Sequence, residues 1–344
     1  MLATISPKSL SVLDTLVEAK NKTPGLRTCD LAQLLSANLP DPRPIIAPLL
    51  FEADLCMIYG WRGAGKTWFS LWLAYCMAAG ISFLGWPCQQ TRRVLIFDGE
   101  MRAARLKKRL AMLANAALPQ EASPDNLHIL TRDMNPATVE WPDLGKEEGR
   151  IAIEQVIDTI QPDVIILDNI SAWVRSGKGE NDEESWRDVA SFLMSQRAQG
   201  RAAVLIHHAG KGGAQRGTSK REDILDTVIA LKKPDDYDPT EGLRVQIVFE
   251  KARNLDGADI PSIEVQLSTE HNKAIFQVTE TDTDPISIVH QLIDAGASRN
   301  EIMQALGCDR FKLVRLEQKA KDQGRGFILP DGRTKKYKGG RVDA

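Results

Sequence analysis

Residues 60–67 read Gly-Trp-Arg-Gly-Ala-Gly-Lys-Thr, which matches the phosphate-loop (P-loop) pattern G-x-x-x-x-G-K-[ST]. An apolar run at residues 55–59 precedes this stretch and a helical pattern follows it, so backbone N–H groups are expected to converge on phosphate oxygens at a helix N-terminus. The Lys66 ammonium is expected to reach the β- and γ-phosphates, and the Thr67 hydroxyl to ligate Mg²⁺. The stretch therefore predicts a nucleotide-binding site made of Gly60, Gly63, Ala64, Gly65, Lys66, Thr67 and Trp68.

A carboxylate suited to the metal follows another apolar run. Asp168 comes directly after residues 164–167, where a parallel strand is expected to end. Open α/β sheets bind their ligands at the carboxyl ends of their strands, so Asp168 is expected to hold the water shell of Mg²⁺ opposite Thr67. The alternative is an ordinary surface acid at a strand end.

The group that orients the attacking water has to come from another part of the chain. Many P-loop ATPases place a glutamate directly after the metal-binding Asp, but this chain has Asn169 there. Residues 94–97 form an apolar run that leads into Asp98 and Glu100, and a strand there could lie beside the P-loop strand. Glu100, which sits past the strand end, is the predicted base, while Asp98 either points into the sheet or assists.

The elements that must position these residues alternate between apolar runs and amphipathic segments, which is typical of βαβ units. Strands are predicted at residues 55–59, 93–97, 127–130, 164–167 and 203–206. Helices are predicted between them at residues 66–79, 102–116, 149–160 and 183–199. Further strands without intervening helices are predicted at residues 227–231, 243–249, 263–267 and 274–278. The fold class is therefore α/β, with a mostly parallel sheet that continues into an antiparallel C-terminal extension.

Composition indicates a soluble globular chain with room for appendages around one core. The chain has 344 residues, of which 43% are hydrophobic and 26% charged, and its five cysteines form no C-x-x-C pair. A reducing, cytoplasmic location and no signal peptide are expected. Residues 68–86 are uncharged and apolar enough to cross a bilayer, but they begin inside the P-loop helix and contain serine and glycine, which favours a core helix.

Three domains are expected. Residues 1–45 contain helical patterns at 9–20 and 28–37 and form an N-terminal helical arm, either a solvated appendage or a subunit contact. Residues 46–282 form the nucleotide-binding domain, and residues 283–344 form a C-terminal domain.

The C-terminal domain is basic and shows a helix-turn-helix pattern. Helices are predicted at residues 286–295, 299–305 and 311–320, followed by a hairpin at residues 326–337 that turns at Asp331-Gly332, as in a winged helix. Eleven Lys or Arg residues face three acids between positions 310 and 341, which suggests a polyanionic partner. The candidate DNA contacts on the second helix of the motif are Arg310, Lys312 and Arg315. The alternative is a small helical protein-binding domain with solvated lysines.

Together, the P-loop, the acid after the second strand and Asp168 without a following Glu resemble the RecA-like ATPase superfamily. Residues 97–101, Phe-Asp-Gly-Glu-Met, are similar to the catalytic strand end of ring-shaped replicative helicases. Residues 205–212, Leu-Ile-His-His-Ala-Gly-Lys-Gly, with Arg-Gly-Thr-Ser at residues 216–219, resemble the RepA-type plasmid helicases more closely. The likeness covers residues 46–280 and does not include the C-terminal sixty residues.

This resemblance implies a γ-phosphate contact and two DNA-facing loops. His207 or His208 would contact the γ-phosphate, unless the pair fills the core. Residues 171–184 and 209–222 fall where RecA-like proteins place their DNA-facing loops, and Trp173 would either stack a base or anchor the core. The implied contacts to single-stranded DNA are Arg175, Lys178, Lys211, Arg216 and Lys220, with Arg221 beside them.

Residues 249–254, Phe-Glu-Lys-Ala-Arg-Asn, are similar to the segment in which replicative helicases supply cations to the ATP of a neighbouring subunit. Lys251 and Arg253 would then act in trans, although RepA-type proteins differ in this segment, and a strand-end salt bridge is the alternative. The resemblance implies an ATP- and Mg²⁺-dependent hydrolase that is a hexameric DNA helicase of plasmid or mobile-element replication. The alternative function is a nucleotide-switched DNA-binding adaptor or repair ATPase that does not unwind DNA.

Overall fold

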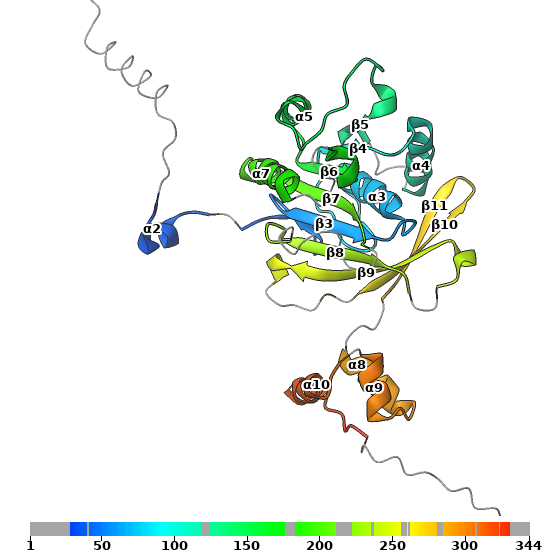
Figure 1. Cartoon of the computed structure of the whole chain (residues 1–344). Coiled ribbons are helices and arrows are strands. Elements are labelled where there is room, and N and C mark those ends of the chain that lie inside the picture. The colour runs from blue at the N-terminus through cyan, green and yellow to red at the C-terminus, as the bar shows by residue number, and fades with distance from the viewer. Residues whose placement is uncertain are drawn as a thin grey trace, which may run out of the picture. The chain divides into compact units, whose positions relative to one another are not determined.

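The computed structural model describes residues 28–39, 41–117, 124–175, 183–210, 222–234, 237–255, 260, 262–280, 285–306, 308–322 and 324–330 (Figure 1). The first 41 residues form a unit of their own. Its described part holds α2 (Leu31–Ser36), which Asp30 caps through a hydrogen bond from the Gln33 amide and which buries none of its residues. The helix predicted at residues 9–20 lies outside the described residues.

One nine-stranded sheet organises residues 55–280, in the order β11-β10-β9-β8-β3-β7-β6-β4-β5. Its strands are β3 (Leu55–Gly60), β4 (Val94–Asp98), β5 (Leu127–Thr131), β6 (Val164–Asp168), β7 (Ala202–His208), β8 (Thr227–Lys232), β9 (Leu243–Ala252), β10 (Ile263–Glu270) and β11 (Lys273–Glu280). Strands β8, β3, β7, β6, β4 and β5 are parallel to their neighbours, and the antiparallel part begins only where β9 pairs with β8. The predicted α/β class with a mostly parallel sheet and an antiparallel extension is confirmed, except that β8 belongs to the parallel part.

The strand that leads to Glu100 does not lie beside the P-loop strand. Strands β7 and β6 separate β4 from β3, so the expected neighbourhood of the two strands is wrong. Asp98, the last residue of β4, instead lies opposite Asp168, the last residue of β6. Asp98 and Asp168 therefore lie side by side at the carboxyl edge of the sheet. The strand that carries Asp168, β6, is also the neighbour of β7.

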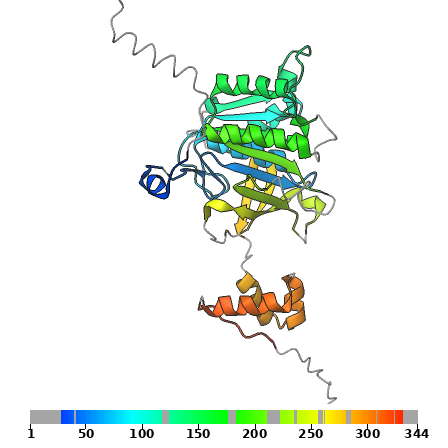
Figure 2. The same cartoon turned by 60° about the vertical axis from the view of Figure 1, so that its left-hand side comes forward.

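Helices cover both faces of this sheet (Figures 1 and 2). On one face lie α3 (Lys66–Ala79) and α4 (Ala103–Ala116), and on the other α5 (Glu147–Ile160), α6 (Ile170–Trp173) and α7 (Glu183–Ala198). Side chains of β3 alternate between them: Cys56 and Ile58 join the core under α3, whereas Met57 joins the core under α5 and α7. Strands buried on both faces are apolar throughout, which is why they were visible in the sequence.

Helix α3, predicted at residues 66–79, is a core helix, as was expected for the apolar residues 68–86 that begin within it. It ends where Gly80 takes a left-handed conformation with φ of 71°, and Leu73, Met77 and most of its other residues are buried. Among the described residues, no helix is both long and apolar enough to cross a bilayer.

A small two-stranded sheet was not predicted. Strands β1 (Pro44–Ile46) and β2 (Leu50–Phe51) pair antiparallel, and Ile46 and Leu50 are fully buried in the α3-side core. Strands of two or three residues are too short to show an alternation of apolar and polar side chains. The pairing of β1 and β2 therefore depends on their contacts with the α3-side core.

The C-terminal segment forms three helices, α8 (Pro285–Asp294), α9 (Arg299–Ala305) and α10 (Arg310–Asp322), close to the predicted ranges. Helix α9 starts with a capping box in which Ser298 and Glu301 satisfy each other's backbone N–H groups. The helices share a core of their own, made of Ile286, Val289, Ile302, Leu313, Ala320 and Phe327. Residues 324–330 contain no strand and the rest of the predicted hairpin lies outside the described residues, so the winged part is not shown.

Candidate nucleotide-binding and active site

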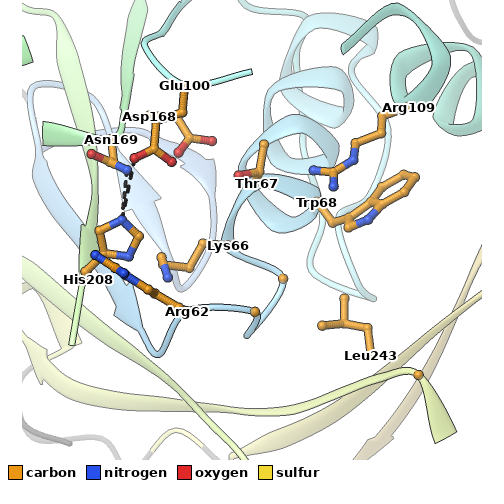
Figure 3. Close-up of a pocket in the computed structure, with 13 residues that line it drawn as sticks. Arg62, Lys66, Thr67, Trp68, Glu100, Arg109, Asp168, Asn169, His208 and Leu243 are labelled. Carbon is orange, nitrogen blue, oxygen red and sulfur yellow. Dashed lines mark hydrogen bonds and ion pairs between the residues drawn. The ribbon is translucent and has the colours of Figure 1, made fainter. Parts of the chain in front are cut away.

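A cavity of about 640 Å³ opens at the carboxyl edge of the parallel strands, beside the start of α3 (Figure 3). The P-loop, the ends of β6 and β7, helix α4 and the start of β9 all contribute to its walls. The lining residues are Arg62, Gly63, Gly65, Lys66, Thr67, Trp68, Glu100, Arg109, Asp168, Asn169, His208, Gly242 and Leu243. Most residues that were predicted from three separate stretches of sequence thus line one cavity of a size that suits a nucleotide.

The P-loop takes the bent form that phosphate binding needs. Gly65 has a φ of 76° and directly precedes α3, so it turns the chain into the helix whose first N–H groups have no partner within the helix. A Cβ atom on Gly65 would lie 2.4 Å from Cδ2 of Leu243, which shows how closely β9 approaches the loop. Gly60 ends β3, and Ala64 is buried behind the loop.

Lys66 is folded onto its own loop. Its Nζ donates to the carbonyl oxygens of Gly60 and Trp61, each at 2.8 Å, and the residue is 7% exposed. Burial lowers its pKa to about 8, with Arg62 acting in the same direction against the carboxylates of the site. The ammonium is thus held near the cavity by weak, neutral acceptors, which anionic phosphate oxygens can replace.

Asp168 is a buried carboxylate held by a hydroxyl group. Its Oδ2 accepts a hydrogen bond of 2.7 Å from Oγ of Ser70, one turn of α3 beyond Lys66. Burial raises its pKa to about 6, and the charges of Asp98 and Glu100 act in the same direction. A cation beside this carboxylate would lower the cost of its negative charge.

The donor set fits Mg²⁺ bound together with a nucleotide. The Thr67 hydroxyl and the Asp168 carboxylate supply hard oxygen ligands at the same wall of the cavity (Figure 3). In the described part of the chain, no group of three or more His, Cys, Asp or Glu side chains is arranged to hold a metal on its own. Mg²⁺ characteristically keeps several waters and takes its remaining ligands from one or two protein groups and substrate phosphates.

Glu100, and not Asp98, faces the cavity. The Glu100 side chain is 54% exposed, and its Oε1 lies 3.7 Å from Nε2 of His208. Asp98 is 3% exposed and accepts hydrogen bonds from the Met101 amide and the Thr131 hydroxyl, each at 3.3 Å. Of the two acids, only Glu100 can approach a water molecule in the cavity, because Asp98 is enclosed in the sheet.

Asn169 holds His208 in one tautomer. Its Oδ1 caps α6 by accepting from the Ala172 amide at 3.2 Å, so its Nδ2 is directed to Nε2 of His208 at 3.0 Å. Nε2 then accepts, and the ring proton is assigned to Nδ1. Burial, followed by the charge of Lys66, lowers the pKa of His208, so the ring is neutral near pH 7. Nε2 of His208 thus accepts from Asn169, and the Glu100 carboxylate lies close to it without a hydrogen bond, at 3.7 Å.

The structure selects His208 from the predicted histidine pair. His207 is fully buried and does not line the cavity, because alternate residues of a strand point to opposite faces of the sheet. The expectation that His207 contacts a γ-phosphate is therefore corrected: this residue is part of the buried interior.

Several residues of the site were not predicted. Arg109 reaches the cavity from the middle of α4, and Leu243 reaches it from the antiparallel extension. Neither carries a sequence signal, because only the tertiary arrangement brings them to the P-loop. Ser70, four residues after Lys66 on one helix face, and Asn169, directly after Asp168, were detectable by spacing.

Lys251 and Arg253 lie far from the cavity of their own chain. Both come at the end of β9, whose first residue lines the cavity, and Ala252 pairs with Thr227 at the amino end of β8. Lys251 Nζ donates to the carbonyl oxygen of Glu222, and Arg253 Nη2 donates to that of Asp223 at 2.7 Å. An Arg253 guanidinium nitrogen also lies 3.9 Å from Asp226. These two cations are thus partnered at the opposite edge of the sheet.

The predicted DNA contacts fall into three groups. Arg175 is exposed, but its guanidinium donates to the carbonyl oxygens of Trp141 and Pro142, and Trp173, two residues earlier, is a buried anchor with 0% exposure. The residues that lie outside the described ranges are Lys178, Lys211, Arg216, Lys220 and Arg221. The third group, Arg310, Lys312 and Arg315, is exposed on α10.

Comparison with known proteins gives one family and similarity to solved structures at low sequence identity. A family model described as an AAA domain matches residues 21–214. A crystal structure of the KaiC-like protein PH0186 from Pyrococcus horikoshii OT3 is 17% identical, with a TM-score of 0.46 over 68% of this chain and 93% of that chain. The flagellar accessory protein FlaH from Methanocaldococcus jannaschii is 14% identical, with a TM-score of 0.44 over 66% of this chain and 91% of that chain. No curated protein matches the chain significantly in sequence.

Proposed function

Because the chain belongs to the AAA domain family and carries a P-loop, we propose that it is an ATP-dependent motor of the RecA-like kind that moves on DNA. In its most specific form, the proposal is a ring-forming replicative helicase of the RepA type, acting in the cytoplasm for a plasmid or another mobile element. The ATPase part follows from the family, and the DNA part extends it.

The observation that carries the proposal is the convergence of a phosphate loop, a buried carboxylate and a solvent-accessible carboxylate on one cavity. The P-loop amides and Lys66 bind the triphosphate, while Thr67 and Asp168 are the residues that would hold Mg²⁺. Bound Mg²⁺ neutralises charge on the phosphate oxygens. Glu100 accepts a proton from the attacking water, and its carboxylate lies 3.7 Å from Nε2 of His208 at the same end of the cavity.

Three features support action on DNA by an assembly of subunits. The sequence resembles RepA-type helicases, the basic side chains of α10 are solvent-exposed, and the cavity of one chain lacks Lys251 and Arg253. If these two residues complete the site of a neighbouring subunit, a ring, in this proposal a hexamer, supplies them to every site. Single-stranded DNA would then run along the cationic loops that face the centre of the ring.

The proposal is tested by ATP hydrolysis and strand displacement with one protein preparation. We expect single-stranded DNA to stimulate ATP turnover, a forked duplex to be unwound with ATP and Mg²⁺, and a Lys66→Ala variant to do neither. Mass measurement with and without a nonhydrolysable ATP analogue gives the assembly state. ATP turnover without unwinding of any fork would refute the helicase, and absence of both binding and turnover would refute the motor.

The second candidate is an adaptor that binds duplex DNA under nucleotide control without unwinding it. The exposed cations of α10, on a three-helix unit with a core of its own, are the observation in its favour. Deletion of residues 283–344 separates the two candidates. A ring helicase is expected to retain ATPase activity stimulated by single-stranded DNA, whereas an adaptor would lose its DNA dependence.

A further inference from the structure

The two ends of the nucleotide cavity differ in chemistry. Glu100, Asp168, Asn169 and His208 gather at one end, together with Lys66 of the phosphate loop (Figure 3). At the other end lie Trp68, Arg109 and Leu243, which have no part in the proposed hydrolysis (Figure 3). Trp68 directly follows Thr67, so this second group begins where the phosphate-binding residues stop.

Arg109 and Trp68 form a cation–π stack. The guanidinium carbon of Arg109 lies 4.9 Å from the centroid of the Trp68 ring, although the two residues come from different helices. Nη1 of Arg109 also donates to the sulfur of Met101 at 3.4 Å, which orients the guanidinium. A guanidinium stacked on an indole is a flat, cationic surface with no acceptor atom.

Leu243 supplies an apolar wall at the same end. It is partly buried, and it approaches the P-loop so closely that Gly65 has no room for a Cβ atom. Gly242, which precedes it, has a φ of 80° and also lines the cavity. The antiparallel extension thus closes the part of the cavity that lies beyond the phosphates.

From these surfaces we propose that the Trp68–Arg109 stack and Leu243 bind the nucleobase by its faces, and that the site therefore accepts adenine and guanine nucleoside triphosphates alike. The inference rests on the proposed nucleotide hydrolysis and adds the base-binding residues and the substrate range. Telling adenine from guanine requires hydrogen bonds to the base edge, where the two differ in donors and acceptors. Among the described lining residues, the carboxylate and amide side chains are Glu100, Asp168 and Asn169, all at the phosphate end (Figure 3). Arg109 only donates, and a single hydrogen bond to N7 is open to both purines, whereas a bidentate contact to N7 and O6 would select guanine.

Magnitudes separate face recognition from edge recognition. Sites that hydrogen-bond a distinguishing group reject the wrong substrate by about 10⁴- to 10⁵-fold, whereas sites without such bonds discriminate by about 200-fold or less. Loss of one base-stacking partner on alanine substitution weakens binding by about 5- to 150-fold. The limits on discrimination apply to the choice between ATP and GTP, and the losses of about 5- to 150-fold apply to variants of Trp68 and Arg109.

The experiment measures kcat and KM of the full chain for ATP and GTP, with Mg²⁺ and single-stranded DNA. We expect kcat/KM for the two nucleotides to agree within about tenfold in the wild type. Trp68→Ala and Arg109→Ala are expected to raise KM for both nucleotides by about 5- to 150-fold and to change kcat less. Trp68→Phe, which retains an aromatic face, is expected to recover most of the affinity, and Arg109→Lys, which keeps the charge without the plane, is expected to recover little.

Inorganic tripolyphosphate, which has no base, is the control ligand. Its inhibition constant is expected to be the same for the wild type, Trp68→Ala and Arg109→Ala. A wild-type preference for ATP over GTP above about 1,000-fold would overturn the proposal, as would equal losses of nucleotide and tripolyphosphate affinity or full recovery with Arg109→Lys.

Binding of ADP and GDP distinguishes a failure of this inference from a failure of the proposed function. Comparable affinities for the two diphosphates without any turnover would leave face recognition standing and remove the hydrolase. Turnover of ATP with no measurable GDP binding would do the reverse. The wild-type ratio of the two affinities does not depend on the folding of any variant.

Discussion

Replacing Asp168 by asparagine is expected to stabilise the nucleotide-free protein while abolishing ATP turnover. Asp168 is 5% exposed and accepts a short hydrogen bond from Ser70, and Thr67 is its second hydrogen-bond partner. An asparagine has the same shape, and its amide oxygen can accept the same hydrogen bond. The substitution therefore removes a buried charge and little else.

The size of the effect follows from the pKa of the carboxyl group. Burial raises this pKa from an ordinary value of 3.8 to about 6. A group whose pKa is raised on folding stabilises the folded state fully below its unfolded pKa, and this contribution is lost as the pH rises through the folded pKa. The loss amounts to about 3 kcal/mol above about pH 7, and an asparagine does not incur it. For a domain of this size, that corresponds to a rise in Tm on the order of 10 °C.

The assay is thermal and urea unfolding of both proteins between about pH 5 and pH 8, with EDTA and without nucleotide. The stability advantage of Asp168→Asn is expected to be small at the acid end and to grow as the pH rises. Asp226→Asn is the matched control, because Asp226 is equally buried but accepts from the Leu55 amide at 2.9 Å and pairs with Arg197 at 3.2 Å. Loss of that paired charge is expected to destabilise the protein.

An Asp168→Asn protein that is no more stable than the wild type at pH 8 would refute this reasoning, as would an advantage that does not depend on pH. Retained ATP turnover in the variant would refute the assignment of Asp168 to the metal site. The two readouts are independent, because unfolding is measured without Mg²⁺ and turnover with it.

Three further substitutions test other parts of the site. Glu100→Gln is expected to keep nucleotide binding, measured by titration of a fluorescent analogue, and to lower kcat by about 10²- to 10⁴-fold because the base is lost; near-normal phosphate release would exclude Glu100 as the base. Gly65→Ala is expected to raise KM for ATP at least tenfold, because φ is 76° and the new Cβ atom would meet Leu243 at 2.4 Å. Adding Leu243→Ala should recover only part of this loss, and full recovery would show that backbone strain is unimportant. Mixing Arg253→Ala with Lys66→Ala is expected to restore part of the turnover at intermediate ratios, and no rescue at any ratio would argue against a finger that acts in trans.

Local sequence patterns were sufficient for the helices and strands of the core, because each element is buried in a regular way. The strand β6 is apolar from Val164 to Leu167 and ends at Asp168, and helix α3 has the predicted ends at Lys66 and Ala79. The short strands β1 and β2 carry too few residues for any period to be read. Their position depends on contacts with a core that is formed by distant parts of the chain.

The candidate site was predictable where residues are adjacent to a motif and unpredictable where strand order or side-chain direction decides. Nothing in the sequence says that β7 and β6 lie between β3 and β4. Glu100 reaches the cavity because it lies past the end of its strand, and not because that strand is a neighbour of the P-loop strand, as had been expected. The choice between His207 and His208 depends on which face of β7 borders the cavity. The two histidines are consecutive and point to opposite faces, so the sequence alone offers one for each face. Arg109 lies on an amphipathic helix whose charged residues look alike until the fold selects one.

The length of strand β9 decides whether Lys251 and Arg253 can reach the nucleotide bound by their own chain. Leu243 lines the cavity and Lys251 lies eight residues further along the same strand, which at about 3.4 Å per residue places the two roughly 27 Å apart. Neither side-chain length nor a rotamer change can cover that distance, so Lys251 and Arg253 have no access to the triphosphate bound by their own chain. Lys251 and Arg253 donate hydrogen bonds to the neutral carbonyl groups of Glu222 and Asp223. The anionic phosphates of a nucleotide bound to another chain can replace these neutral acceptors. If these residues take part in hydrolysis, the turnover number per chain must rise with protein concentration as subunits assemble. A turnover number that stays constant across the concentrations at which the protein assembles would exclude Lys251 and Arg253 from the reaction.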